Sequence, residues 1–207
     1  VYNFILSRLP QAGEPLSSAA AHHFENPGKM LRARMVMRGA YLLNVDDNAA
    51  IRWAAAIELL HNASLVHDDI CDGDKLRRGQ QAVWTKFGRH VALTLGDWLI
   101  SLSFELASEA AQIAKTPKLV TLLARHMATT TAGEAMEFEF DRKNDWETYL
   151  QIAADKTAPL LTAPLQGVAI MALDARAEIV VASYFRYLGK AYQIANDIMN
   201  FHGKDGA

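Results

Sequence analysis

The chain has 207 residues, of which 51% are hydrophobic, so it is long and apolar enough to bury a core. Its formal net charge of −2 lacks the basic excess typical of nucleic-acid-binding proteins, and we expect no nucleic acid partner. The single cysteine, Cys71, excludes an internal disulfide and indicates a reducing compartment, for which we expect the cytoplasm.

Apolar residues recur at helical spacing along almost the whole chain, without a convincing strand or repeat. The pattern predicts helices over residues 15–24, 29–43, 48–72, 89–113, 117–142, 146–155, 156–172 and 175–202. We expect Asp47 or Asn48 to cap the 48–72 helix and Gly73 to end it. The polar segment 73–89 is expected to be a long ordered loop. The predicted fold class is all-α, a helical bundle around one central cavity.

The longest uncharged run, Thr157 to Leu173, contains Pro159 and Pro164 and is short for a membrane span. We interpret it as a buried helix and expect no transmembrane segment. Residues 1–207 are expected to form a single helical domain that is truncated at its C-terminus.

The sequence His67-Asp68-Asp69-Ile70-Cys71-Asp72 is an acidic cluster at a predicted helix end. Asp68 and Asp72 are four residues apart, so they share a helix face, where like charges repel. The negative end of the helix dipole disfavours them further. Two interpretations stay open at this point: a solvated acidic helix end, or a set of hard oxygen ligands for Mg²⁺.

Two adjacent arginines, Arg77 and Arg78, follow this cluster and precede Gly79. Guanidinium groups bind phosphate oxygens in a bidentate manner. Carboxylates beside arginines therefore favour a site for a metal-bound diphosphate.

These motifs resemble the trans-isoprenyl diphosphate synthases, or polyprenyl synthetases. Asp68-Asp69-Ile70-Cys71-Asp72 with Arg77-Arg78-Gly79 is similar to the family's first aspartate-rich motif, DDxxD followed by RRG. Further similar segments, in order, are Gly28-Lys29-Met30-Leu31-Arg32, the helix from Glu58 to His67, Leu95-Gly96-Asp97-Trp98-Leu99, Gly133-Glu134 and Lys156-Thr157. The resemblance covers about residues 28–206 and implies an isoprenoid-synthase-type bundle that lacks its last helices.

The resemblance also implies a Mg²⁺-dependent prenyltransferase that condenses an allylic diphosphate with isopentenyl diphosphate. Mg²⁺ is expected at Asp68, Asp72 and Asp197, with Asp69 in support. The allylic diphosphate is expected at Arg77 and Lys156. The residues expected at isopentenyl diphosphate are Lys29, Arg32, His61 and Arg78, and those expected at the reacting centre are Thr157 and Gln193. The expected assembly is a homodimer or a heteromer.

The second aspartate-rich motif departs from the family pattern, because Asn196-Asp197-Ile198-Met199-Asn200 has amides where the outer carboxylates are expected. An amide oxygen can ligate Mg²⁺ but brings no charge. Three functions therefore compete. They are an active synthase, a catalytically weakened subunit or binding protein of the same fold, and a class I terpene cyclase. Against the cyclase, Lys29 and Arg32 would have no second diphosphate to bind.

Product length is predicted from the residues just before the first motif. In the family, a bulky aromatic side chain there stops chain elongation early. The fifth and fourth positions before Asp68 are the small residues Ala63 and Ser64, and Ala63 is expected to face the cavity. We therefore predict a product of C20 or longer.

Overall fold

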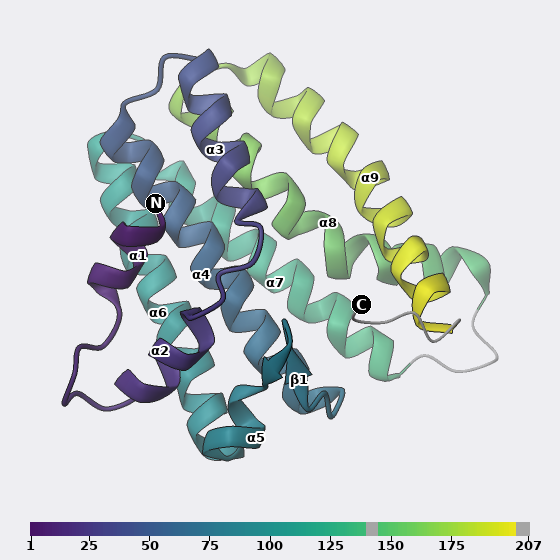
Figure 1. Cartoon of the computed structure of the whole chain (residues 1–207). Helices are drawn as coiled ribbons and strands as arrows, with labels where there is room; N and C mark the ends of the chain where they lie inside the picture. The colour runs from purple at the N-terminus through teal and green to yellow at the C-terminus, as the bar shows by residue number, and fades with distance from the viewer. Residues whose placement is uncertain (140–144, 202–207) are drawn as a thin grey trace.

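The computed structural model describes residues 1–139 and 145–201, with side chains up to residue 199. Within these ranges the chain is almost entirely helical (Figure 1). The elements are α1 Tyr2–Arg8, α2 Ser17–Phe24, α3 Leu31–Leu42, α4 Asp47–Cys71, β1 Leu76–Arg77, β2 Gln80–Gln81, α5 Val83–Phe87, α6 Arg89–Ile113, α7 Lys118–Phe138, α8 Trp146–Met171 and α9 Ala175–Phe201. The all-α prediction is confirmed.

Helix α4 is the centre of the core. It begins after Asp46, whose carboxylate accepts hydrogen bonds from the amides of Asn48 and Ala49 at 2.9 and 3.0 Å. The cap is thus one residue before Asp47 and two before Asn48, the predicted caps, because Asp46 reaches two orphan amides at once. Trp53 and the alanines around it are fully buried. Small side chains let α3, α6 and α8 pack closely around this helix.

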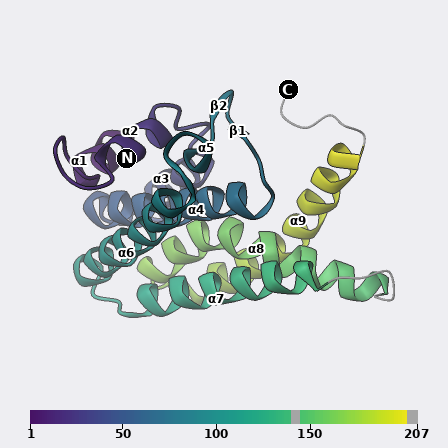
Figure 2. The ribbon, with the colours of Figure 1, turned by 90° about the horizontal axis from the view of Figure 1, so that it is seen from below.

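The layers are clearest in Figure 2. There α7 and α8 lie on one side of α4 and α6, and the short elements α1, α2 and α5 lie on the other. Helix α9 packs against α8, and its C-terminal part rises away from the layer of α7 and α8 (Figure 2). This arrangement places the C-terminal half of α4, which carries the acidic cluster, opposite α7 and α8.

Three local predictions were wrong. Helices α1 and α5 are absent from the prediction because seven and five residues carry little periodicity. The expected loop contains a two-stranded antiparallel hairpin, turned by Arg78 and Gly79, which both have positive φ. Residues 146–171 form one continuous helix where two were expected. The predicted ends at residues 142 and 202 lie outside the described residues.

The apolar run of α8 is buried against its neighbours, as predicted. Among the described residues, α6 is the one helix that is long and apolar enough to cross a membrane. In this fold, 44% of its most apolar stretch is buried, and it packs along α4.

Candidate active site

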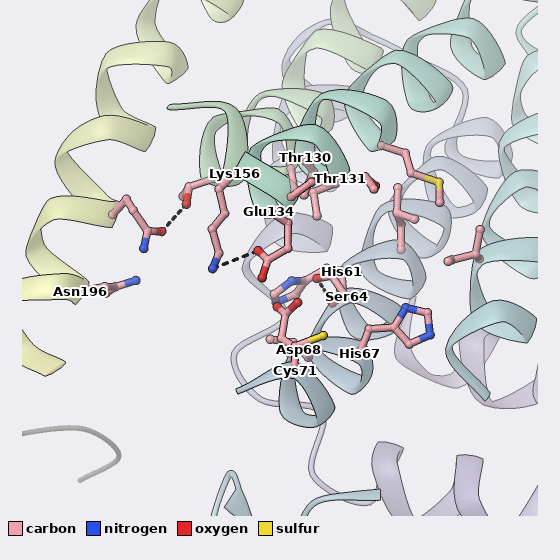
Figure 3. A pocket seen from close by; sticks show the side chains of 18 of the residues that line it. His61, Ser64, His67, Asp68, Cys71, Thr130, Thr131, Glu134, Lys156 and Asn196 are labelled. Atoms are coloured by element: carbon pink, nitrogen blue, oxygen red, sulfur yellow. Dashed lines mark hydrogen bonds and ion pairs between the residues drawn. The ribbon is translucent and has the colours of Figure 1, made fainter. Parts of the chain in front are cut away.

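A cavity of about 750 Å³ lies between α4, α6, α7, α8 and α9 (Figure 3). Its apolar wall includes Leu60, Ile100, Met127 and Leu160. The sequence-predicted residues that line it are Arg32, His61, Asp68, Arg77, Lys156, Thr157 and Gln193. The predicted residues outside the lining are Lys29, Asp69, Asp72, Arg78 and Asp197. The structure thus brings together seven of the predicted residues from distant parts of the sequence.

The two acidic residues Asp68 and Asp69 have different environments. Asp68 lines the cavity, and burial, with the nearby carboxylate of Glu134, raises its pKa to about 7. Asp69 is 1% exposed and accepts a hydrogen bond from Arg77 Nε at 2.7 Å on Oδ1. Its other oxygen is buried without a hydrogen-bond partner among the described residues. Asp69 therefore orients Arg77, while Asp68 presents its carboxyl group to the cavity.

The first motif fits a hard divalent cation in part. Asp68 and Asp72 lie one helical turn apart, and burial raises the pKa of both carboxyl groups. Where the structure describes the chain, no three His, Cys, Asp or Glu side chains converge on one point. A cation at Asp68 would need oxygen ligands from water or phosphate as well, which is how Mg²⁺ is usually held.

Lys156 reaches the cavity from α8. Its ammonium lies 3.0 Å from Glu134 Oε2 and pairs with Glu137, both on α7 (Figure 3). Burial lowers the pKa of Lys156, but the bonds to Glu137 and Glu134 outweigh it and raise the pKa. Gly133 permits this contact, because a Cβ there would lie 2.5 Å from the backbone nitrogen of Lys156. Glu134 and Glu137 were not predicted as site residues, although their i,i+3 spacing indicates a shared helix face.

Arg32 and His61 form a second polar group on the cavity wall. Arg32 Nε donates to Leu160 O at 3.0 Å. Burial, then the charges of Arg32 and Arg78, hold the pKa of His61 well below its usual value, so the imidazole is neutral. The buried carboxylate of Glu58 accepts from Ala33 N at 2.8 Å and thereby anchors the start of α3. No sequence pattern predicted a role for Glu58, beyond its place in the helix that carries the motif.

Arg78 joins two of the predicted motifs. Its guanidinium donates to Asn26 O at 2.7 Å and covers Gly28, where a Cβ would lie 3.0 Å from Arg78 Cζ. The backbone of Gly28 has φ +68°, which also favours glycine. Lys29 follows in the same turn and is exposed. Neither Arg78 nor Lys29 lines the cavity.

The second motif faces the cavity through Asn196, not through Asp197. Asp197 Oδ2 accepts from Tyr149 Oη at 2.5 Å, and Oδ1 accepts from Gln193 Nε2 at 2.9 Å. Thr157 Oγ1 in turn donates to Gln193 Oε1 at 2.5 Å. The side chain of Asn200 lies outside the described residues. The one carboxylate of this motif is thus occupied by protein donors.

The predicted position of Ala63 was wrong. Ala63 is fully buried in the core, and the next residue, Ser64, lines the cavity. One residue rotates a helical side chain by about 100°, so Ala63 points away from a wall that Leu60 and Ser64 share.

Comparison with known proteins identifies the family. The family model for polyprenyl synthetase matches residues 14–207. The chain belongs to the polyprenyl synthetase family. It is 33% identical over 214 residues to geranylgeranyl diphosphate synthase of Saccharolobus solfataricus, covering 99% of this chain and 62% of that enzyme. It is 33% identical over 195 residues to heptaprenyl diphosphate synthase component 2 of Geobacillus stearothermophilus, covering 92% of this chain and 59% of that protein.

A solved structure supports the fold of this polyprenyl synthetase family member. The polyprenyl synthase of Caulobacter crescentus, complexed with calcium and isoprenyl diphosphate, superimposes with a TM-score of 0.88 at 30% identity. That alignment covers 97% of this chain and 61% of the other. The chain therefore spans about three fifths of the length of these relatives.

Proposed function

We propose that this chain is a trans-prenyltransferase that condenses an allylic diphosphate with isopentenyl diphosphate. The observation that carries the proposal is one apolar-walled cavity that meets two separate cationic groups. Lys156 and Arg77 lie beside the acidic cluster, and Arg32 lies beside His61 on the same wall. Two diphosphates need two such groups, whereas a cyclase binds one diphosphate.

In the proposed reaction the allylic carbon–oxygen bond breaks, and its electron pair leaves with the diphosphate. The isopentenyl double bond then attacks the allylic cation, and the new carbon chain loses a proton to the released diphosphate. Lys156 and Arg77 would bind the leaving group, and Asp69 would hold Arg77 in place. The wall of Leu60, Ile100 and Met127 would exclude water, which otherwise captures the cation.

We propose Mg²⁺ as the metal, held by Asp68 and Asp72 together with the oxygens of a bound diphosphate. When bound, it would neutralise charge on the diphosphate. Arg32 and His61, with Arg78 and Lys29 at the cavity edge, would hold isopentenyl diphosphate. We propose C20 as the product, in agreement with the geranylgeranyl diphosphate synthase relative and with the small side chain of Ser64.

The experiment is incubation with isopentenyl diphosphate, farnesyl or geranyl diphosphate and Mg²⁺, followed by chromatography of the dephosphorylated products. We expect a new product that contains the carbon atoms of both substrates. A cyclic product, formed without isopentenyl diphosphate, would instead support the cyclase.

A catalytically weakened subunit is the second candidate. Two observations favour it: Asn196 replaces a carboxylate on the cavity wall, and one relative is a component of a heptaprenyl diphosphate synthase. In that case the chain alone would be inactive, and a partner chain would restore turnover. Size measurement of the purified protein would separate this heteromer from the homodimer that we propose for the active enzyme.

A further inference from the structure

The hydrogen bonds around Asp197 form a continuous chain between α8 and α9. The donors run from Thr157 to Gln193, from Gln193 to Asp197 and from Tyr149 to Asp197, at 2.5, 2.9 and 2.5 Å. Gln193 and Tyr149 donate directly to the Asp197 carboxylate, and Thr157 donates to Gln193, so donation runs toward Asp197 from both ends. A carboxylate only accepts, so it fixes the direction of each donor that contacts it.

The direction matters most for Gln193. Its NH₂ group must face Asp197, so its carbonyl oxygen faces Thr157. The hydroxyl hydrogen of Thr157 is then committed to Gln193, and only oxygen lone pairs of Thr157 remain for the cavity that both residues line. Lone pairs stabilise developing positive charge, whereas a hydroxyl hydrogen aimed at the cavity would oppose it.

We propose that Asp197 is a positioning residue for this wall and not a metal ligand, and that Tyr149 is its partner. The inference rests on the proposed function for its catalytic meaning. Asp197 does not line the cavity, and each of its oxygens already accepts a hydrogen bond from the protein. Burial and the contact with Asp197 raise the pKa of Tyr149, so its hydroxyl remains a donor.

Substitution of Asp197 by asparagine tests the chain with little change in shape. An amide places an NH₂ group where one carboxylate oxygen stood, so at these two positions it can accept from Tyr149 or from Gln193 but not from both. Tyr149→Phe removes the hydroxyl donor at the other end of the hydrogen-bond chain. Tyr149 is not a predicted metal ligand, so this variant leaves every predicted metal ligand unchanged. Asp197→Asn should let Gln193 turn over and present its NH₂ group to Thr157, whereas Tyr149→Phe keeps the carboxylate but removes the hydroxyl that holds it in place.

The first measurement is Mn²⁺ binding, followed by electron paramagnetic resonance with saturating inorganic pyrophosphate. We expect Asp197→Asn and Tyr149→Phe to bind Mn²⁺ with wild-type stoichiometry and affinity, and Asp68→Asn to lose at least one ion. Loss of Mn²⁺ in Asp197→Asn, with wild-type binding in Tyr149→Phe, would overturn the proposal.

The second measurement is steady-state turnover of the same variants. We expect each single variant to lower kcat at least tenfold with both KM values within twofold of wild type. The kcat of the double variant should be no lower than that of Asp197→Asn, because both substitutions break the same hydrogen-bond chain. Multiplicative losses would contradict a shared chain. Tyr187→Phe, on the exposed face of α9, is the matched control and should leave kcat unchanged.

The third measurement separates this inference from the proposed function. Thermal unfolding should show equal shifts in Tm for Tyr149→Phe, Asp197→Asn and the double variant. If the wild type proves inactive as a prenyltransferase, the Mn²⁺ and Tm results still decide the role of Asp197. Additive Tm shifts would show that Tyr149 and Asp197 act separately.

Discussion

The ammonium of Lys156 lies 3.0 Å from Glu134 Oε2, and this ion pair joins α8 to α7 at the cavity wall. About one fifth of each side chain is exposed, so the pair is largely shielded from water. A shielded cation between two carboxylates stabilises the fold, whereas its loss leaves like charges uncompensated.

Lys156→Met tests this arrangement. We expect it to lower the free energy of unfolding at pH 7.5 by about 1 to 3 kcal/mol, because Glu134 and Glu137 lose their counter-ion beside Asp68. Urea unfolding would measure the change. Lys118→Met is the matched control, since its ion pair with Glu178 is more exposed and should contribute less than about 0.5 kcal/mol. Equal losses in the two variants would contradict the shielding argument.

Asp68→Asn should change how stability depends on pH. The folded protein holds the Asp68 proton up to a pKa of about 7, whereas the unfolded chain releases it near the ordinary value of 3.8. The unfolded state therefore binds fewer protons between these values, and Asp68 makes the fold less stable as pH rises through that window. Asp68→Asn should abolish this decline.

At pH 7.5, Asp68→Asn should be more stable than the wild type by about 1 to 2 kcal/mol, because solvent access reduces the effect. Turnover should fall at least about a hundredfold, because the metal proposed at Asp68 would lose a ligand. Asp97→Asn is the control, since Asp97 lines the same cavity with its side chain 77% exposed. A wild type whose stability is flat between pH 4 and 7 would contradict the assigned environment.

Arg32→Gln should raise the KM for isopentenyl diphosphate about tenfold, because a charged hydrogen bond contributes about 1.5 kcal/mol or more. The KM for the allylic diphosphate should change little. Lys29→Ala should have a smaller effect on the same constant, since Lys29 is exposed outside the cavity lining. Initial-rate kinetics with each substrate varied in turn would measure both. Equal effects on the two KM values would indicate a structural role for Arg32.

Asn196→Asp should lower the Mg²⁺ concentration needed for half-maximal turnover. Asn196 lines the cavity, so a carboxylate at this position would add charge where a metal-bound diphosphate is proposed. Turnover across a Mg²⁺ titration would measure it. Asn44→Asp, an exposed position outside the cavity lining, adds the same charge and should leave the requirement unchanged.

Ser64→Phe should shorten the product, because the ring would fill part of the cavity that the growing chain needs. Ala63→Phe should behave differently. It overpacks the core and should destabilise the fold by about 1 to 3 kcal/mol without a comparable shift in product length. Chromatography of products and thermal unfolding of both variants would distinguish the two positions.

The first acidic motif could be predicted because its information is local. The four-residue spacing of Asp68 and Asp72 places both on one helix face whatever the rest of the chain does. The long helices were predictable for the same reason. Even so, an error of one position changes which face of α4 is expected to meet the cavity. Ala63 was predicted on the cavity wall, and Ser64 lies there instead.

The partners of site residues could not be predicted. Tyr149 and Asp197 are 48 positions apart, and their contact depends on how α8 packs against α9. Glu137 and Lys156 likewise meet only because Gly133 lets α7 approach α8. Such contacts arise from packing between helices, and helical periodicity within each segment carries no information about them.

The contact between Gly28 and Arg78 has a consequence for how this sequence can vary. A Cβ at position 28 would lie 3.0 Å from Cζ and Nε of Arg78, so a side chain there would press on the guanidinium and require it to shift. Conversely, a shorter residue at position 78 would leave the 26–28 turn without the donor that holds Asn26 O. The two positions, 50 residues apart, thus depend on each other, and a substitution at one disturbs the contact made by the other.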